Sequence, residues 1–484
     1  MTNDESRLVL VASNRGPVSF GFAADGSLTT TRGGGGMVSG MMSGLAAAAA
    51  DGDVLWLCTA LSDADREAAR RGERAQGGAG DAPVRMLDIP PDTFDAAYNG
   101  IANSVLWFVH HMLFDTPNQP RFGADFRRDW DAYAAYNEAF AAALADEDAA
   151  GTRVLIQDYH LALTPRLLRD RRPRARIAHF EHTPWAPPAY YRMLPDDVAV
   201  AVLDGMLGAD YAGFHADRWA AAFLDCCEAV LGAKVSRSTQ GTGQVSYRGR
   251  VTDVAVDPLG TDAAALRARG READVRAAAD TIAAMAEGRQ LIVRVDRTEL
   301  SKNVVGGLAA YRELLATRPQ WRGRVVHLAF AYPSRSGVAE YHRYTARVHE
   351  LAREINDEFG TPDWKPLILD VRDDYPRSLA ACRLADVLLV NPIRDGMNLV
   401  AQEGPILSDR GCALVLSREA GAASLIGASA LLVNPFDVTA TAAALHDALC
   451  MPAAERQRRS GAIAAAAAAQ APHQWLADQL EALA

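Results

Sequence analysis

The chain has 484 residues, of which 49 % are apolar and 23 % are charged, a composition that excludes a mainly disordered protein. Its 50 lysines and arginines stand against 60 aspartates and glutamates, and the formal charge of −10 excludes a general attraction to nucleic acid or to an anionic membrane. At roughly 100–200 residues per domain, the length predicts two to four domains.

Signals of export or of a membrane span are missing from the sequence. No apolar run reaches the roughly 18 residues that a span needs, and the polar, partly acidic residues 1–7 are unlike a signal peptide. The six cysteines form no CxxC pair and are typical of buried, reduced thiols. We therefore expect a cytoplasmic protein that binds neither membranes nor nucleic acid.

Short apolar runs bounded by Gly, Pro or Asp recur along the chain, and each is typical of a strand buried on both faces. They are Leu8–Ala12, Val54–Cys58, Val154–Ile156, Ile177–Phe180, Leu291–Val293, Val325–Phe330, Leu367–Leu369, Val387–Val390, Ala413–Leu416 and Leu431–Val433. Stretches with helical period lie between them: Trp130–Leu144, Asp217–Leu231, Val304–Ala316 and Val338–Phe359. Asp63–Pro83 lacks periodicity and predicts an exposed helix and loop. The alternation predicts an α/β fold with parallel sheets.

Two such series flank Val256–Asp262, whose Pro and Gly are typical of a domain joint. We predict two Rossmann-like domains, residues 1–257 and 258–455, that face a central cleft. Helices in 456–484 are expected to pack back on the first domain. Because ligands of open α/β sheets bind beyond the carboxyl ends of the strands, polar residues directly after the strands are the candidates for chemistry.

In the first series, an acid and an imidazole follow neighbouring strands. Asp158-Tyr159-His160 and His182-Thr183-Pro184 should emerge at one edge of the sheet and could polarise sugar hydroxyls, although a lone His there is as often structural. Ser13-Asn14-Arg15 follows the first strand. The glycines Gly33–Gly36 could present backbone N–H groups to an anion, but a flexible turn is the commoner reading.

In the second series, Arg297 and Lys302 follow the first strand, and two cations at this spacing suit a diphosphate, with a solvated turn as the alternative. Asn391–Val400 follows a later strand and leads to Glu403, whose carboxylate could bind ribose hydroxyls. Asp373-Asp374 is read as a solvated turn. We predict neither a metal ion nor a cofactor.

Together and in this order, these segments resemble the trehalose-6-phosphate synthases. That family consists of retaining glycosyltransferases of the GT-B type, with two Rossmann-like domains, which move glucose from a nucleotide sugar to glucose 6-phosphate. The resemblance runs from Ser13 to about Asp437. It rests on Ser13-Asn14-Arg15, Gly33–Gly36, Tyr98-Asn99 with Asn103–Trp107, Asp158–Leu161, His182–Pro184, Arg297–Lys302, and Asp395–Val400 with Glu403.

The resemblance implies site residues for both substrates. The acceptor glucose 6-phosphate would be held by Arg15, Tyr98, Trp107, Asp158 and Arg335. The nucleoside diphosphate glucose would be held by Gly34, Gly35, His182, Arg297, Lys302, Asp395, Gly396, Met397, Asn398, Leu399, Val400 and Glu403. The catalytic residues would be Asp158, His182, Arg297 and Lys302. The resemblance also implies retention without a covalent enzyme intermediate.

Departures from the family pattern point to a sister branch, the validoxylamine phosphate synthases, which join a GDP-activated cyclitol to an amino-cyclitol phosphate. The second Trp that the family usually has shortly after Trp56 is missing, and Trp185 follows the His-Thr-Pro motif. Glu299 stands where the family usually has Asp, and Asn303 stands where many members have Gly. The other motifs favour the glucosyl branch. We therefore predict a trehalose-6-phosphate synthase that prefers GDP-glucose to UDP-glucose. The alternatives are a pseudo-glycosyltransferase of the sister branch and a non-catalytic sugar-phosphate sensor. The sequence is compatible with a homo-oligomer.

Overall fold

The computed structural model describes residues 8–32, 41–42, 44–45, 53–76, 82–149, 151–238, 242–335 and 337–484. The chain divides into two compact units, Met1–Leu259 with Pro472–Ala484, and Gly260–Ala471. The first boundary lies inside the predicted joint, two residues beyond the expected 257. The expected C-terminal segment 456–484 is divided, because α18 (Ala453–Ala468) belongs to the second unit and only α19 (Pro472–Glu481) belongs to the first.

The first unit is built on a sheet in the order β10-β11-β12-β9-β8-β7-β1-β4-β6-β5. Its parallel strands are β1 (Val9–Ala12), β4 (Val54–Thr59), β6 (Pro83–Leu87), β7 (Arg153–Gln157), β8 (Arg176–Glu181), β9 (Tyr211–Phe214) and β12 (Arg250–Val256). Antiparallel pairs at the two edges involve β5 (Ala75–Gln76), β10 (Lys234–Arg237) and β11 (Gly243–Tyr247). The strand order reverses between β1 and β7, so this point is a topological switch point.

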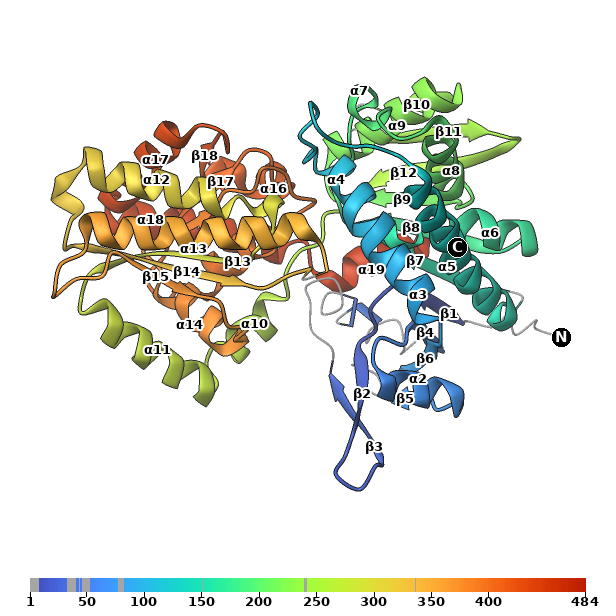
Figure 1. The fold of residues 1–484 in the computed structure, drawn as a ribbon, viewed down its shortest axis with the longest axis horizontal. Helices are drawn as coiled ribbons and strands as arrows, with labels where there is room; N and C mark the ends of the chain where they lie inside the picture. Colours follow the sequence, from blue (N-terminus) through green and yellow to red (C-terminus); the bar gives the residue numbers. More distant parts are fainter. Residues whose placement is uncertain are drawn as a thin grey trace. The chain divides into compact units, whose positions relative to one another are not determined.

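Helices and a hairpin surround this sheet (Figure 1). They are the hairpin β2 (Val18–Phe22) and β3 (Leu28–Arg32), α2 (Asp63–Arg70), α3 (Pro91–Asp95), the π-helix η1 (Ala96–Leu106), α4 (Trp107–His110), α5 (Ala124–Glu147), α6 (Thr164–Arg171), α7 (Pro188–Tyr191), α8 (Asp196–Met206) and α9 (Asp217–Leu231). The expectation of an exposed helix and loop over Asp63–Pro83 is wrong in part. Helix α2 buries Ala64 and Ala68, and the segment also contains β5.

The second unit is built on a parallel sheet in the order β15-β14-β13-β16-β17-β18. Its strands are β13 (Gln290–Arg297), β14 (Val325–Tyr332), β15 (Leu367–Asp370), β16 (Val387–Val390), β17 (Ala413–Ser417) and β18 (Leu431–Val433). Numbered along the chain, the order is 3-2-1-4-5-6, that of dinucleotide-binding Rossmann sheets, with its switch point between β13 and β16.

Helices cover both faces of this second sheet. They are α10 (Ala263–Arg269), α11 (Ala273–Ala286), α12 (Val304–Thr317), α13 (Ala339–Phe359), α14 (Tyr375–Leu384), α15 (Val400–Leu407), α16 (Ala422–Ile426), α17 (Val438–Cys450) and α18. Helices α12 and α13 lie on one side of the strands, and α11 and α14 lie on the other (Figure 1). Every residue of β16 and β17 is buried, which explains their uninterrupted apolar runs. Within the described ranges, no helix is long and apolar enough to cross a membrane.

Candidate active site

The predicted donor segments meet at the switch point of the second unit. β13 ends at Arg297, Lys302 ends the short 3-10 helix η3 (Leu300–Lys302), and residues 395–399 lead from β16 toward α15. Lys302 forms an ion pair with Asp395, and Asn398 Nδ2 donates to Asp395 Oδ2 at 3.0 Å. The structure therefore brings together the diphosphate candidate Lys302 and the candidate sugar-binding loop.

Glu299 organises the cations of this site. Its fully buried carboxylate lies 2.9 Å from Arg297 Nη1 and 3.9 Å from Arg335 Nη1, and it accepts a hydrogen bond from Ser334 Oγ at 2.8 Å. Burial favours a raised pKa for Glu299, but the nearby charges, that of Arg297 foremost, outweigh it and lower the pKa to about 2. An ionised Glu299 thus holds both guanidinium groups beside the end of β13. The sequence had shown Glu299 only as a departure from the family pattern.

The loop before α15 is held by backbone hydrogen bonds from the segment that follows β17. The N–H of Gly421 donates to Asp395 O at 3.0 Å, and that of Ala422 donates to Met397 O at 2.8 Å. A Cβ on Gly421 would lie 1.7 Å from Gly396 O, so only glycine permits this approach. Gly396–Leu399 is therefore fixed against the chain that follows β17. Its continuation, α15, directs the partial positive charge of a helix N-terminus toward this loop.

Glu403 lies in the first turn of α15. Burial raises the pKa of Glu403 to about 7, because a charged carboxylate loses its hydration there. Its charge in turn contributes to the raised pKa of Tyr375, of which burial is the main cause. A desolvated carboxyl at the mouth of a Rossmann-type sheet is the group that we expect to bind ribose hydroxyls.

We expect Glu403→Gln to stabilise the fold at pH 8 and to weaken binding of the nucleotide. A carboxyl with a raised pKa binds its proton more tightly in the folded state, so its contribution to stability is present at low pH and is lost as pH rises toward 7. The variant should gain about 1–3 kcal/mol in unfolding free energy at pH 8 and nothing near pH 4. Denaturant titrations at both pH values and the KM for the donor measure these effects. Glu358→Gln on α13 is the control, and equal effects of the two variants would contradict the expectation.

In the first unit, the acceptor candidates gather beyond the carboxyl end of β7. Asp158 follows this strand with a φ of 75°, a strained conformation that is concentrated at functional sites. His160 Nδ1 lies 3.5 Å from Asp158 Oδ2, and the Tyr98 ring stacks on His160 with centroids 5.5 Å apart. Trp107 approaches the ring of Tyr159 at 5.7 Å. Tyr98, Trp107 and Asp158, far apart in the sequence, thus lie around one segment.

Asp158 and Glu181 form a buried acidic pair in different protonation states. Burial opposes ionisation of Asp158, but the hydrogen bond from His160 and the charge of His160 lower its pKa below the ordinary range. Burial, followed by the charge of Asp158, raises the pKa of Glu181 well above its ordinary value. The protonated carboxyl of Glu181 is hydrogen-bonded to Asp158, whereas Gln157 Nε2 is buried without a hydrogen-bond partner in the part of the chain that the structure describes. Such a polar atom indicates a ligand site.

Arg15 is exposed at the carboxyl end of β1, on the opposite side of the switch point from Asp158. Its backbone is anchored, because Ser13 Oγ donates to Arg15 O at 2.7 Å and itself accepts from Trp56 Nε1 at 2.8 Å. The expected acceptor residue Arg335 lies in the second unit, beside Glu299. The expected donor residues Gly34 and Gly35 lie outside the described residues.

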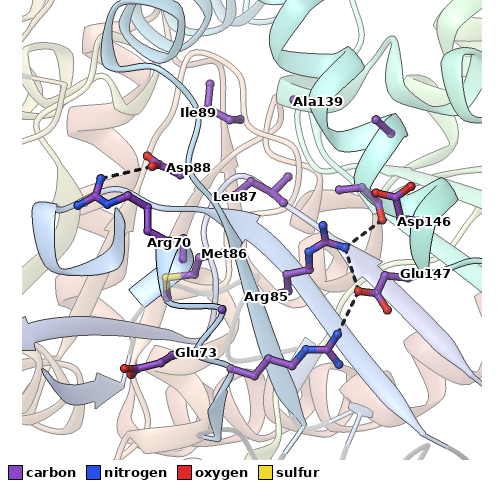
Figure 2. A pocket seen from close by; sticks show the side chains of 15 residues that line it. Arg70, Glu73, Arg85, Met86, Leu87, Asp88, Ile89, Ala139, Asp146 and Glu147 are labelled. Atoms are coloured by element: carbon purple, nitrogen blue, oxygen red, sulfur yellow. Dashed lines mark hydrogen bonds and ion pairs between the residues drawn. The ribbon is translucent and has the colours of Figure 1, made fainter. Parts of the chain in front are cut away.

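A cavity of about 690 Å³ opens elsewhere on the first unit, between α2, β6 and α5. Figure 2 shows Arg70 paired with Asp88 and Arg85 paired with Glu147 at its wall. None of the predicted site residues lines it. Because its four acidic side chains outnumber its three arginines, it is not a candidate anion site. No group of three or more His, Cys, Asp or Glu among the described residues could hold a metal ion.

Two Rossmann-type units, one with paired cations at its switch point, define the GT-B class of glycosyltransferases. Residues 7–484 match the model of glycosyltransferase family 20, and the chain belongs to this family. It is therefore a glycosyltransferase.

Curated relatives match along most of the chain. A probable UDP-forming alpha,alpha-trehalose-phosphate synthase 2 of Arabidopsis thaliana is 33 % identical over 458 residues, which are 93 % of this chain and 54 % of the relative. The chain thus spans about half the length of that relative. The UDP-forming alpha,alpha-trehalose-phosphate synthase of Schizosaccharomyces pombe is also 33 % identical over 458 residues, with 93 % of this chain and 85 % of the relative covered.

Solved structures share the fold over nearly the full length. The structure described as trehalose-6-phosphate from E. coli bound with UDP-2-fluoro glucose has a TM-score of 0.84 at 27 % identity, covering 98 % of each chain. A UDP-forming synthase from Burkholderia xenovorans in complex with glucose 6-phosphate has a TM-score of 0.86 at 25 % identity, covering 99 % of this chain and 100 % of that one. These likenesses confirm the predicted GT-B fold class.

The expected preference for GDP-glucose is not supported. The relatives are named UDP-forming, and the E. coli structure holds a UDP-sugar analogue. The expectation rested partly on Trp56 and Trp185, and both are core residues of the first unit. Trp56 is fully buried and donates to Ser13, while Trp185 packs on Tyr191 and Phe223. Neither tryptophan therefore reports on the donor base.

Proposed function

We propose that the chain transfers glucose from UDP-glucose to glucose 6-phosphate with retention, giving α,α-trehalose 6-phosphate. The observation that carries the proposal is the cluster of Arg297, Lys302 and Asp395 at the switch point of a Rossmann-type sheet. UDP as the leaving group is supported by the names of the relatives and by the UDP-sugar in the E. coli structure. Glucose 6-phosphate as the acceptor is supported by the Burkholderia complex.

In this proposal, the chain's own cations stabilise the departing diphosphate. Negative charge grows on the diphosphate oxygen as the bond to the anomeric carbon breaks, so Arg297 and Lys302 bind the transition state more tightly than the ground state. The acceptor hydroxyl attacks from the face that the diphosphate leaves, and a diphosphate oxygen takes the hydroxyl proton. Asp395 orients Lys302, and the fixed backbone of Gly396–Leu399 binds the donor sugar. The role expected for His182 at that sugar stays a prediction.

The acceptor is proposed to bind at the first unit. Ionised Asp158 accepts hydrogen bonds from the sugar hydroxyls, which also offer a partner to the buried Gln157 Nε2. Tyr98 and Trp107 form the aromatic wall, and Arg15 binds the 6-phosphate by charge-assisted hydrogen bonds. The role expected for Arg335 at the phosphate stays a prediction. A cytoplasmic location remains a prediction.

Nucleotide release tests this function directly. The protein is incubated with UDP-glucose or GDP-glucose, each with and without glucose 6-phosphate, and the initial rates are compared. We expect release of the nucleoside diphosphate to depend on the acceptor and to be fastest from UDP-glucose. Faster release from GDP-glucose would contradict the proposed donor. Binding of glucose 6-phosphate without any release would favour a sensor, and release only with an amino-cyclitol phosphate would favour the sister branch.

Activity should survive removal of divalent cations, because the proposed charge stabilisation comes from Arg297 and Lys302. We expect the rate with UDP-glucose and glucose 6-phosphate to be unchanged after dialysis against EDTA. Complete loss of turnover that magnesium restores would contradict a mechanism based on the cation pair alone. The same dialysis with the Arg347→Ala variant controls for nonspecific effects of EDTA.

A further inference from the structure

Asn303 lies at the end of η3, directly after the candidate diphosphate residue Lys302. Its φ is 56°, the left-handed conformation that glycine and asparagine tolerate best. The backbone at this position would therefore be equally satisfied by glycine. The side chain of Asn303 is buried, with 9 % exposed, so a role beyond the backbone conformation has to come from its amide group.

The side-chain amide of Asn303 joins η3 to two other strand ends. Asn303 Nδ2 donates to Asn391 O at 3.1 Å and to Pro435 O at 2.9 Å. Asn391 directly follows β16, and Pro435 lies just beyond β18. Because both acceptors are carbonyl oxygens, only the amide nitrogen of Asn303 can face them, and both of its hydrogens are used. One side chain thus ties together the carboxyl ends of β13, β16 and β18.

The backbone around Lys302 is held from two further sides. The N–H of Ile393, in the segment after β16, donates to Ser301 O at 2.8 Å. The fully buried Arg294 of β13 donates from Nη2 to Lys302 O at 2.9 Å. Because η3 is a single short turn between these contacts, the direction of the Lys302 side chain depends on where Asn303 holds the end of that turn.

We propose that Asn303 is a positioning residue of glucosyl transfer, which ties η3 to the ends of β16 and β18 so that the Lys302 ammonium meets the departing diphosphate. The inference rests on the proposed function, in which Lys302 binds that diphosphate. Lys302 is paired with Asp395, on the segment that begins with Asn391. The Asn303 amide thus holds both partners of this ion pair in place without touching the substrate, and all of these residues belong to the second unit.

Glycine is the substitution that isolates the side-chain amide. Asn303→Gly keeps access to the left-handed conformation and removes both hydrogen bonds, so the backbone at this position is not strained. Glu287→Gly is the matched control, because Glu287 also has a positive φ, 49°, and lies exposed at the end of α11, outside the candidate site. The two variants together separate the loss of the amide from the added chain entropy of a glycine.

Amide hydrogen exchange measures the tie between the strand ends without substrate. In Asn303→Gly, we expect the amide of Ile393 to exchange roughly 10-fold faster than in the wild type, because the segment after β16 loses its connection to η3. Exchange in the buried strands β16 and β17 should not change, and Glu287→Gly should leave the Ile393 amide as in the wild type. An Ile393 amide that exchanges at the wild-type rate in Asn303→Gly would overturn the proposal.

Kinetics in two backgrounds test whether Asn303 acts through Lys302. We expect Asn303→Gly to lower kcat with UDP-glucose roughly 10-fold and to leave the KM for glucose 6-phosphate unchanged. In Lys302→Ala protein, the same substitution should change kcat less than about 2-fold, because effects that act through one group are not additive. Full additivity, or a wild-type kcat in Asn303→Gly, would overturn the proposal. A wild-type protein that releases no UDP would instead contradict the proposed function, and hydrogen exchange distinguishes the two failures.

Discussion

Replacing Arg297 or Lys302 by Ala is expected to lower kcat with UDP-glucose by roughly two to three orders of magnitude, the usual effect of removing one preorganised donor to a developing charge. Arg297 is 43 % exposed and bound to Glu299 on one side, so its loss should leave the fold intact. Lys302 is 14 % exposed and paired with Asp395, and its loss should also lower the melting temperature. Steady-state kinetics and thermal unfolding of both variants measure these effects.

Arg347→Ala is the matched control for the Arg297 variant. Arg347 is an arginine of the same unit with similar exposure, and it is paired with Glu350 and Glu354 on α13. It should keep wild-type kcat. Arg297→Lys should be intermediate, because it keeps the charge and loses the planar fork. If Arg297→Ala and Lys302→Ala both turn over like the control, the second unit does not bind the diphosphate in the proposed way.

Arg15→Ala is expected to remove most of the preference for glucose 6-phosphate over glucose. A charge-assisted hydrogen bond to phosphate is worth about 1.5–3 kcal/mol, so the ratio of kcat/KM for the two acceptors should fall roughly 10- to 100-fold. The exposed position of Arg15 after β1 and its anchored backbone leave the guanidinium available to a ligand. The two kcat/KM values are measured at saturating UDP-glucose.

Arg237→Ala controls for the loss of a positive charge from the first unit. Arg237 is 39 % exposed and is paired with Asp225 and Glu228. The ratio of the two acceptor efficiencies should not change in this variant. An unchanged ratio in Arg15→Ala would show that Arg15 does not recognise the phosphate, and the remaining candidate for that role would be Arg335.

The parallel strands that were predicted from apolar runs coincide with strands of the structure, because burial on both faces leaves an uninterrupted signal in the sequence. The missed strands lack this signal. β10 has no fully buried residue, β11 has one, and β12 alternates between buried and exposed positions. β9 is fully buried, but its four residues include Gly213, against whose backbone the Phe180 ring packs. Pairing with the neighbouring strands, and not a local apolar pattern, determines that these residues form strands.

The sequence predicted candidate site residues where a polar side chain lies at or beyond the carboxyl end of a strand that its apolar run had indicated. Asp158 and His182 directly follow β7 and β8, Arg297 is the last residue of β13, and Asp395 lies in the segment between β16 and α15. The role of Glu299 depends on its contacts with Arg335 and Ser334, which lie in another segment, and the sequence carries no local signal for it.

The most direct test of the account is the structure of the product formed from UDP-glucose and glucose 6-phosphate. The mixture is followed by ¹H NMR, with the anomeric couplings reporting the linkage. The account predicts a disaccharide phosphate with two α-anomeric protons, formed in step with UDP and in equal amount. A product with a β-configured glucosyl residue would contradict retention. Hydrolysis of UDP-glucose to free glucose without a disaccharide would contradict the proposed acceptor.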